Sequence, residues 1–421
     1  MNEKWLHHLW MYKLYRTASL KTTDGKPLEI LHHGEYNTNA GPDFLMAKIK
    51  CDELLLAGHI ELHLKSSDWD KHGHSTDPNY HPVILHVVYE HDVHLPYFQQ
   101  KNIPTLELKN YLPPELVRTY NSLQNNFKFV PCEKFSIPQF FSPLLYEKLL
   151  LEKLENKCRE YEERLKLTQN HWEQLVFEEL AYAFGLKINA PNFRQLAENI
   201  DFSVLQKIRY KQEALEALFF GATGLIETPK DDYMMYLQRE YAFLKNKFGL
   251  KIPQQSVLFL RLRPHNFPTL RLSQLAHLYY KEPHLFSKIK ESKNLAELLH
   301  LFQDIHASEY WKNHFVFGKT VSKSSTKYLS KNFKTLLLLN TILPLYYFIH
   351  RSFEEEILDK VLDFYRELAP ENNALLSRWN NLGITPQNAL ESQALLWLYG
   401  GFCKEKKCLN CSIGYQLLKS K

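Results

Sequence analysis

The spacing of hydrophobic residues predicts a mixed α/β segment at the start of the chain. Residues 2–15 carry apolar side chains at helical spacing, and the side chain of Asn2 can cap the first turn. Short segments then alternate apolar and polar residues with the period of two that is typical of strands. These strands are predicted at residues 28–33, 43–50, 54–65, 82–92 and 103–109.

From about residue 140 the apolar residues recur with the period of amphipathic helices. Residues 142–167 predict one long helix with dense charge on one face. The apolar run at residues 335–350 is interrupted by Asn340 and Pro344, so we interpret it as a pair of buried helices. Further helices are predicted at residues 171–185, 193–221, 234–248, 270–280, 294–304 and 354–368.

This order of elements predicts an α+β fold, with a mixed sheet at the N-terminus followed by a larger, mainly helical domain. A chain of 421 residues is too long for one typical core. We therefore divide it into an α/β domain at residues 1–130, a helical domain at residues 131–384 and a C-terminal unit at residues 385–421. The last unit carries a cysteine cluster and is expected to pack on the domain junction.

Charge and histidine are unevenly distributed along the chain. The first hundred residues hold nine Lys and Arg against thirteen Asp and Glu, a net charge of −4, while the whole chain carries +5. Twelve of the twenty histidines lie in the same hundred residues. An acidic, histidine-rich segment beside a basic body suits a metal site next to an anion-binding surface, although such an imbalance often reflects only solubility.

The sequence also bounds the class of protein. No apolar run is long enough to span a bilayer, and the first residues lack the layout of a signal peptide. Six cysteines in a chain of this length do not make a disulfide framework. We therefore expect a cytoplasmic protein with no membrane partner.

The strands at residues 43–50 and 54–65 form a predicted hairpin with unusual polar residues. Centring its turn on Asp52 places Asp43 opposite Glu61, and Glu61, His63 and Lys65 then share one face while the alternate apolar residues pack on the other. Two opposed carboxylates repel, and a Mg²⁺ or Mn²⁺ ion would relieve the repulsion. Such an ion could polarise a phosphoryl group and activate a water molecule.

A histidine-rich loop follows this hairpin. His72 and His74 lie among three aspartates, and His86 projects from the next strand. The aspartates are Asp68, Asp70 and Asp77. Imidazoles with carboxylates are ligands of Zn²⁺ and Mn²⁺, so a hydrolase built on His72 and His74 is a second interpretation. Surface histidines without a metal are the alternative.

Cysteines form a separate cluster near the C-terminus. Cys403, Cys408 and Cys411 have the spacing C-x4-C-x2-C, and Cys132 in a Pro-containing turn is the best candidate for a fourth ligand. Four thiolates would bind Zn²⁺ or an iron–sulfur cluster. The alternative is a set of reduced thiols.

Arginines surround a second turn. Arg261, Arg263 and Arg271 flank an Asn-Phe-Pro turn that precedes a helix. Arginines beside aromatic residues and a helix N-terminus are typical phosphate contacts, so these three are candidates for nucleic-acid binding. A solvated basic face with Phe267 buried is the alternative.

The hairpin resembles the core of the PD-(D/E)xK nuclease superfamily. The resemblance rests on a Pro-Asp pair ending at Asp43 and on Glu61-Leu62-His63 in the next strand. It implies a restriction-endonuclease-like domain with a helix before the strands that often carries another acidic residue, here Glu3. His63 replaces the lysine of the motif, so either His63 or Lys65 would supply the cation. Some DNA-processing nucleases of this superfamily have a similar layout of one upstream and three C-terminal cysteines.

The whole chain also resembles a bacterial family of unknown function. The similarity rests on the segments NAGPDF, GHIELHLKSSDWDKHGH, YHPVILHVVYEHD, VPCE, EALFFGATGLIE, RLRPHNFPTLRLSQLA and CLNCSIG. It implies kinship and no particular activity. The leading hypothesis is therefore a metal-dependent nuclease acting on DNA or RNA, with Mg²⁺ held by Asp43 and Glu61. The alternatives are a non-catalytic binding or scaffold protein with a nuclease-like fold, or a Zn²⁺ or Mn²⁺ hydrolase that uses the histidine-rich loop.

Overall fold

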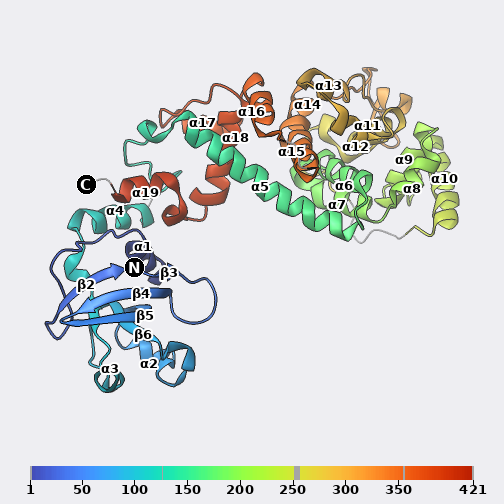
Figure 1. The fold of residues 1–421 in the computed structure, drawn as a ribbon. Helices are drawn as coiled ribbons and strands as arrows, with labels where there is room; N and C mark the ends of the chain where they lie inside the picture. The colour runs from blue at the N-terminus through green and yellow to red at the C-terminus, as the bar shows by residue number, and fades with distance from the viewer. Residues whose placement is uncertain (1, 126, 251–256, 354–355, 420–421) are drawn as a thin grey trace. The chain divides into compact units, whose positions relative to one another are not determined.

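The computed structural model describes residues 2–125, 127–250, 257–353 and 356–419. These described residues form two compact units, each considered separately below (Figure 1). Unit 1 comprises Met1–Phe141 together with Leu398–Lys421, and unit 2 comprises Ser142–Trp397. The C-terminal segment expected from residue 385 thus begins at Leu398 and belongs to the same unit as the N-terminal sheet.

Unit 1 contains the predicted mixture of helices and strands. Asn2 caps its first helix, since the Asn2 side chain accepts a hydrogen bond of 3.0 Å from the backbone N–H of Trp5. The elements are α1 (Glu3–Met11), β1 (Leu20–Lys21), β2 (Pro27–His32), β3 (Glu35–Tyr36), β4 (Phe44–Cys51), β5 (Leu54–Lys65), α2 (Asp68–Lys71), β6 (Val83–Glu90), α3 (Pro96–Lys101), β7 (Thr105–Glu107), α4 (Pro114–Gln124) and α19 (Ser412–Lys419). The strands expected from the alternating pattern are β2, β4, β5, β6 and β7, and the pattern missed only very short strands.

The strands form one mixed sheet in the order β1-β2-β4-β5-β6-β7, with β3 paired to β4. Neighbours are antiparallel from β1 to β5, and β5, β6 and β7 are parallel. The parallel pairing of β5 with β6 requires a crossover. The histidine-rich loop and α2 are that crossover, so they fold back along the strand that carries Glu61 and His63.

The β4–β5 hairpin reaches the predicted register by an unexpected route. Its turn holds two residues, because Cys51 pairs with Leu54, and this register is one residue away from the one counted from Asp52. A bulge between Phe44 and Ala47, where Met46 has a φ of 56°, shifts the pairing by one residue. Phe44 then pairs with Ile60, as the sequence count requires.

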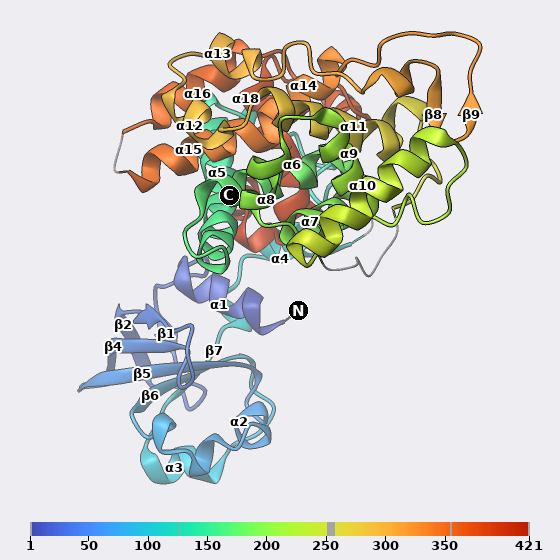
Figure 2. The ribbon, with the colours of Figure 1, turned by 90° about the vertical axis from the view of Figure 1, so that its right-hand side faces the viewer.

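Residues 60–63 of β5 are buried on both faces of the sheet. Helix α1 lies on one side of the sheet, and α2 and α3 lie on the other (Figure 2). Ile60 and Leu62 are buried as expected, but Glu61 and His63 are only 5% and 1% exposed. Buried polar groups need partners, so their contacts become informative.

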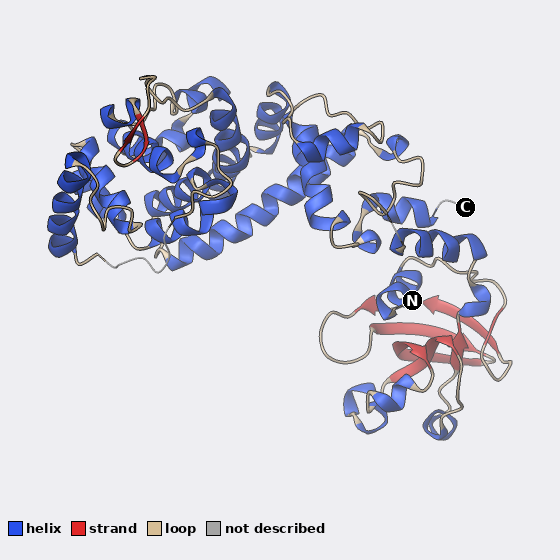
Figure 3. Cartoon of the chain, turned by 180° about the vertical axis from the view of Figure 1, so that it is seen from behind, coloured by secondary structure: helices blue, strands red, loops and turns tan. Residues whose placement is uncertain are grey.

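Unit 2 is almost entirely helical (Figure 3). Its helices are α5 (Pro143–Leu167), α6 (Trp172–Phe184), α7 (Leu186–Glu198), α8 (Phe202–Ile208), α9 (Gln212–Ala222), α10 (Asp232–Phe248), α11 (Pro268–Lys281), α12 (Leu285–Glu291), α13 (Leu295–His300), α14 (Lys331–Leu337), α15 (Leu343–Ser352), α16 (Leu358–Glu367), α17 (Ala374–Asn380) and α18 (Ala389–Leu398). A small hairpin joins β8 (His314–Val316) to β9 (Lys319–Thr320).

Two helix predictions in unit 2 need correction. The segment 193–221 is divided among α7, α8 and α9. The apolar run 335–350 is not broken at Asn340, because a π-helical turn at Leu338–Ile342 carries α14 directly into α15. In the prediction for 354–368, residues 354–355 lie outside the described part of the chain. None of the described helices has both the length and the apolar character needed to cross a bilayer.

Candidate metal centre

Asp43 and Glu61 hold the two strands of the hairpin together. Oε2 of Glu61 accepts a hydrogen bond of 3.0 Å from the backbone N–H of Asp43. In return, Oδ2 of Asp43 accepts one of 3.0 Å from the backbone N–H of Leu62. Each carboxylate is thereby fixed by the opposite strand. The two residues are adjacent, as the hairpin count predicted, and the second oxygen of Glu61 faces the histidine-rich loop.

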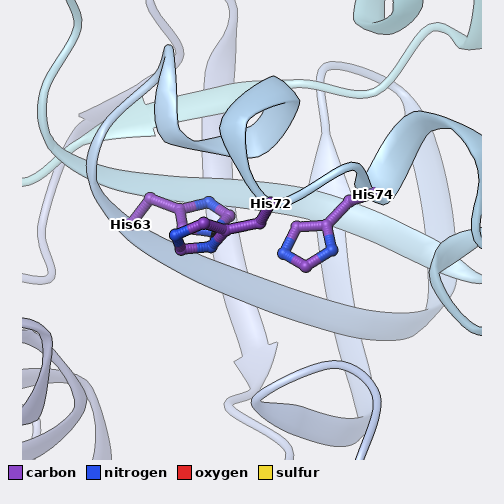
Figure 4. Close-up of side chains that lie close together, drawn as sticks. All are labelled: His63, His72 and His74. Carbon is purple, nitrogen blue, oxygen red and sulfur yellow. Dashed lines mark hydrogen bonds between the residues drawn. The ribbon is translucent and has the colours of Figure 1, made fainter.

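His63, His72 and His74 lie close together, and one ligand atom from each lies within 4.8 Å of the other two (Figure 4). Oε1 of Glu61 lies 3.5 Å from Nε2 of His74 and 3.6 Å from Nε2 of His63. Nε2 of His63 lies 3.1 Å from Nδ1 of His72. A tetrahedral Zn²⁺ site with bonds near ~2.1 Å separates its ligand atoms by ~3.4 Å. These separations therefore match the edges of a metal coordination shell.

The next strand supplies a partner that fixes the orientation of His63. Nδ1 of His63 lies 2.9 Å from Nε2 of His86, which is fully buried on β6. If Nε2 of His63 offers its lone pair to a metal, Nδ1 carries the proton and donates to His86. This is the arrangement by which metal-binding histidines are usually oriented.

Burial favours the neutral form of His63, the form that metal binding requires, and of its partner His86. Burial lowers the pKa of His63 to about 3, and the neighbouring His74 and His72 add to the shift. Burial likewise places the pKa of His86 well below its ordinary value. Burial raises the pKa of Glu61, and the negative charge of Asp43 acts in the same direction.

Helix α1 contributes a histidine where the sequence predicted a carboxylate. Nε2 of His7 lies 3.1 Å from Oδ2 of Asp43. Burial acts to lower the pKa of His7, but its contact with Asp43 outweighs burial and raises that pKa, with Glu3 adding a smaller effect. Glu3 lies one helical turn before His7. The spacing of four residues was the available signal, because it puts both side chains on one face of the helix.

Several other predicted residues have structural contacts. Lys65 is exposed at the end of β5, and its backbone N–H donates a 3.0 Å hydrogen bond to Oδ2 of Asp68. Asp68 also pairs with Lys71 at 2.6 Å, and Asp77 caps a short turn through the N–H of Asn79. These carboxylates order the crossover that carries His72 and His74.

The three arginines expected to contact phosphate belong to unit 2. Arg261 and Arg263 are exposed before α11. Arg271 is only 4% exposed, its guanidinium carbon lies 3.5 Å from the centroid of the Phe333 ring, and it donates to two side-chain amide oxygens. A contact with nucleic acid needs an accessible guanidinium, so the position of Arg271 indicates a packing role.

The four candidate cysteines come together in unit 1. Cys132, Cys403, Cys408 and Cys411 are all buried and line one cavity. Burial raises the pKa of Cys132 and of Cys408 to about 12, and neighbouring thiols of the cluster add to both shifts. Their place in the lining of one cavity brings the four side chains near one another.

Comparison with known proteins identifies a family for this chain but assigns it no activity. No curated protein and no solved structure matches this chain. The resemblance to the PD-(D/E)xK superfamily therefore stays a prediction. A family model described as a protein of unknown function, DUF2851, matches residues 3–374. That match covers most of the chain, and the chain belongs to the DUF2851 family.

Proposed function

We propose that unit 1 is a metal-dependent hydrolase whose ion is held by Glu61, His63, His72 and His74. The observation that carries this proposal is the clustering of ligand atoms from His63, His72 and His74 within 4.8 Å of one another, with Oε1 of Glu61 3.6 Å from Nε2 of His63 and 3.5 Å from Nε2 of His74. Nitrogen donors favour Zn²⁺ or Mn²⁺ over the Mg²⁺ expected from the carboxylates alone. When bound, such an ion would polarise a substrate oxygen and lower the pKa of a bound water.

The substrate class that we propose is a phosphodiester of nucleic acid. Support comes from the residue pattern around Asp43 and Glu61 and from the mixed sheet, in which a helix precedes the strands and a crossover leads to a parallel strand. Both features agree with the PD-(D/E)xK resemblance. DNA and RNA are equally compatible with this reasoning.

The other residues of the site have definite tasks under this proposal. His7 holds Asp43 in place through a contact of 3.1 Å, which leaves the second oxygen of Asp43 to orient a water or accept its proton. The side chain of Asp43 is 20% exposed and His72 is exposed, so the site is open to solvent on this side. Glu61 and His63 form its buried floor.

A nuclease assay tests the proposal directly. Wild-type protein is incubated with single- and double-stranded DNA and RNA, with Mn²⁺, Zn²⁺ or Mg²⁺ added separately. We expect metal-dependent cleavage that falls by a factor of roughly a hundred or more in Asp43→Ala and in His74→Ala. Asp52→Ala, in the exposed turn of the same hairpin, is the matched control and should retain activity.

Two results would contradict the proposal. Equal cleavage by wild type and Asp43→Ala would mean that a contaminant is responsible. Metal-loaded wild type that cleaves none of the substrates would favour the non-catalytic alternative, in which the imidazoles pack against aromatic rings. The stacking of His74 on Tyr80, with ring centroids 3.7 Å apart, is the contact that would then matter.

A further inference from the structure

Unit 1 is assembled from two segments that are far apart in the chain. Its first segment ends at Phe141 and its second begins at Leu398, so the whole of unit 2 is inserted between them. Closing a loop of this length costs chain entropy before any contact between the segments forms. A covalent or metal link between the segments would therefore stabilise unit 1 considerably.

The cysteines lie on both segments at the place where these segments meet. Cys132 lies in the turn after α4, and the other three lie between α18 and α19. All four line one cavity of about 20 Å³, and their exposed fractions range from 6% to 9%. The described cysteines are free of disulfides. The rest of the lining is apolar or glycine: Leu123, Pro131, Phe402 and Gly414.

The backbone around the cluster is shaped to bring the cysteines together. Glu133 accepts hydrogen bonds from the backbone N–H groups of Lys128 and Phe129 at 2.7 and 2.8 Å, which fixes the turn that holds Cys132. A Cβ added at Gly414 would lie 2.1 Å from the carbonyl oxygen of Cys408. Only glycine lets α19 approach the cysteine segment this closely.

Three lysines and Glu405 lie in the segment between Cys403 and Cys408. The lysines are Lys404, Lys406 and Lys407, and Nζ of Lys406 donates a 3.2 Å hydrogen bond to the carbonyl oxygen of Gln124. Four thiolates around Zn²⁺, or around a common iron–sulfur cluster, leave a negatively charged centre. The lysines would offset that charge from the solvent side.

We propose that Cys132, Cys403, Cys408 and Cys411 bind a thiolate-coordinated metal centre, either Zn²⁺ or an iron–sulfur cluster, that joins the two segments of unit 1. Both candidates require four thiolates, and the four cysteines that line the cavity supply this number of ligands. The centre closes a loop of about 270 residues between Cys132 and Cys403, and it would stabilise unit 1 by restricting the unfolded chain. It is separate from the Glu61–histidine site and does not depend on it.

Metal analysis of the full-length protein tests this proposal. The protein is purified without chelators, once in air and once under strictly anaerobic conditions, from cells supplied with zinc and iron. Zinc, iron and acid-labile sulfide are measured per chain, and the ligand type is read from X-ray absorption at the metal edge. We expect either one zinc surrounded by sulfur or a coloured preparation with iron and sulfide in cluster proportions.

Variants separate this centre from the proposed hydrolase site. Cys408→Ser should lose the sulfur-bound metal, while His74→Ala and the matched control Cys51→Ala, a buried cysteine on β4, should keep it. A second readout is thiol reactivity in the native state, since bound thiolates react slowly until a chelator removes the metal. These measurements require no enzymatic activity.

The proposal is overturned by either of two findings. One is the absence of any sulfur-coordinated metal in both preparations, with the four thiols reacting freely in the native protein. The other is a metal that Cys408→Ser retains and only His74→Ala loses. X-ray absorption on the wild type decides the matter even if Cys408→Ser does not fold.

Discussion

Glu61→Gln should uncouple the stability of unit 1 from divalent metal. The substitution keeps the size of the side chain and an oxygen that can accept the 3.0 Å hydrogen bond from Asp43, but removes the charge that faces His63 and His74. Burial and the charge of Asp43 both raise the pKa of Glu61, so its ionised form is less favourable here than in water, and a bound cation would offset part of that cost. Without metal the variant should therefore be as stable as wild type, or more stable by about 1 kcal/mol.

With a bound divalent metal, wild type should instead be more stable than Glu61→Gln. An ion present at a hundred times its dissociation constant stabilises the native state by about 2.7 kcal/mol. For a domain of 150–250 residues this corresponds to a rise in melting temperature of roughly 5–10 °C. Loss of one ligand weakens metal binding on the order of a hundredfold. At the same metal concentration, the metal then stabilises the variant by only about 0.4 kcal/mol, and its melting temperature rises by only about 1 °C.

Thermal melts with and without Mn²⁺ measure the difference. Mn²⁺ suits the test because it accepts nitrogen and oxygen ligands and binds unfolded thiols less strongly than Zn²⁺. Glu53→Gln is the matched control, since the side chain of Glu53 is 93% exposed at the turn of the same hairpin and should leave the wild-type response unchanged. An equal rise in melting temperature for wild type and Glu61→Gln would refute the assignment of Glu61 as a ligand.

Three further predictions concern stability. Burial raises the pKa of Glu173, at the start of α6, to about 7, whereas the unfolded chain releases this proton near pH 4.5. Between pH 4.5 and 7 the free energy of unfolding of wild type, measured in urea, should therefore fall by about 3 kcal/mol relative to that of Glu173→Gln. A difference between the two proteins that stays constant over this pH range would exclude the raised pKa. Gly414→Ala should destabilise unit 1 by about 1–3 kcal/mol in the same assay because of the clash with Cys408, whereas Gly400→Ala, with no atom within 4 Å of the new Cβ, should be neutral. Arg271→Ala should cost about 2–4 kcal/mol and leave nucleic-acid affinity unchanged, as a gel-shift titration would show.

The β4–β5 hairpin shows which features of the site could be predicted from the sequence alone. Alternation of apolar and polar residues was enough to predict β4 and β5 and to bring Asp43 next to Glu61. The count from Asp52 succeeded only because the two-residue turn and the bulge at Met46 offset each other. A bulge is selected by contacts across the sheet, and the local pattern carries no sign of it.

The partners of this hairpin were harder to predict, because they depend on the crossover. Once β6 pairs in parallel with β5, the connecting loop must lie across the sheet, and His72 and His74 then meet His63. The sequence analysis predicted these histidines as ligands of a separate site, whereas the structure brings His63 and His74 next to Glu61. His7 was missed although it lies four residues after Glu3 on the same face of α1, because the prediction for this helix considered only a carboxylate.

The cysteine cluster was easier to predict, because the choice of Cys132 depended on the number of ligands that a metal needs and not on how the strands pair. Three clustered thiols lack a fourth ligand, and a cysteine beside proline at the end of the N-terminal domain was the most suitable candidate. The sequence analysis predicted a C-terminal unit that packs on the domain junction, and in the structure Leu398–Lys421 and the four cysteines belong to unit 1. A chain that inserts about 250 residues into a domain must bring the two parts of that domain together again. The packing of α19 on α4 contributes to this closure, and a metal centre would add a bond whose strength does not depend on the small apolar area of so short a helix.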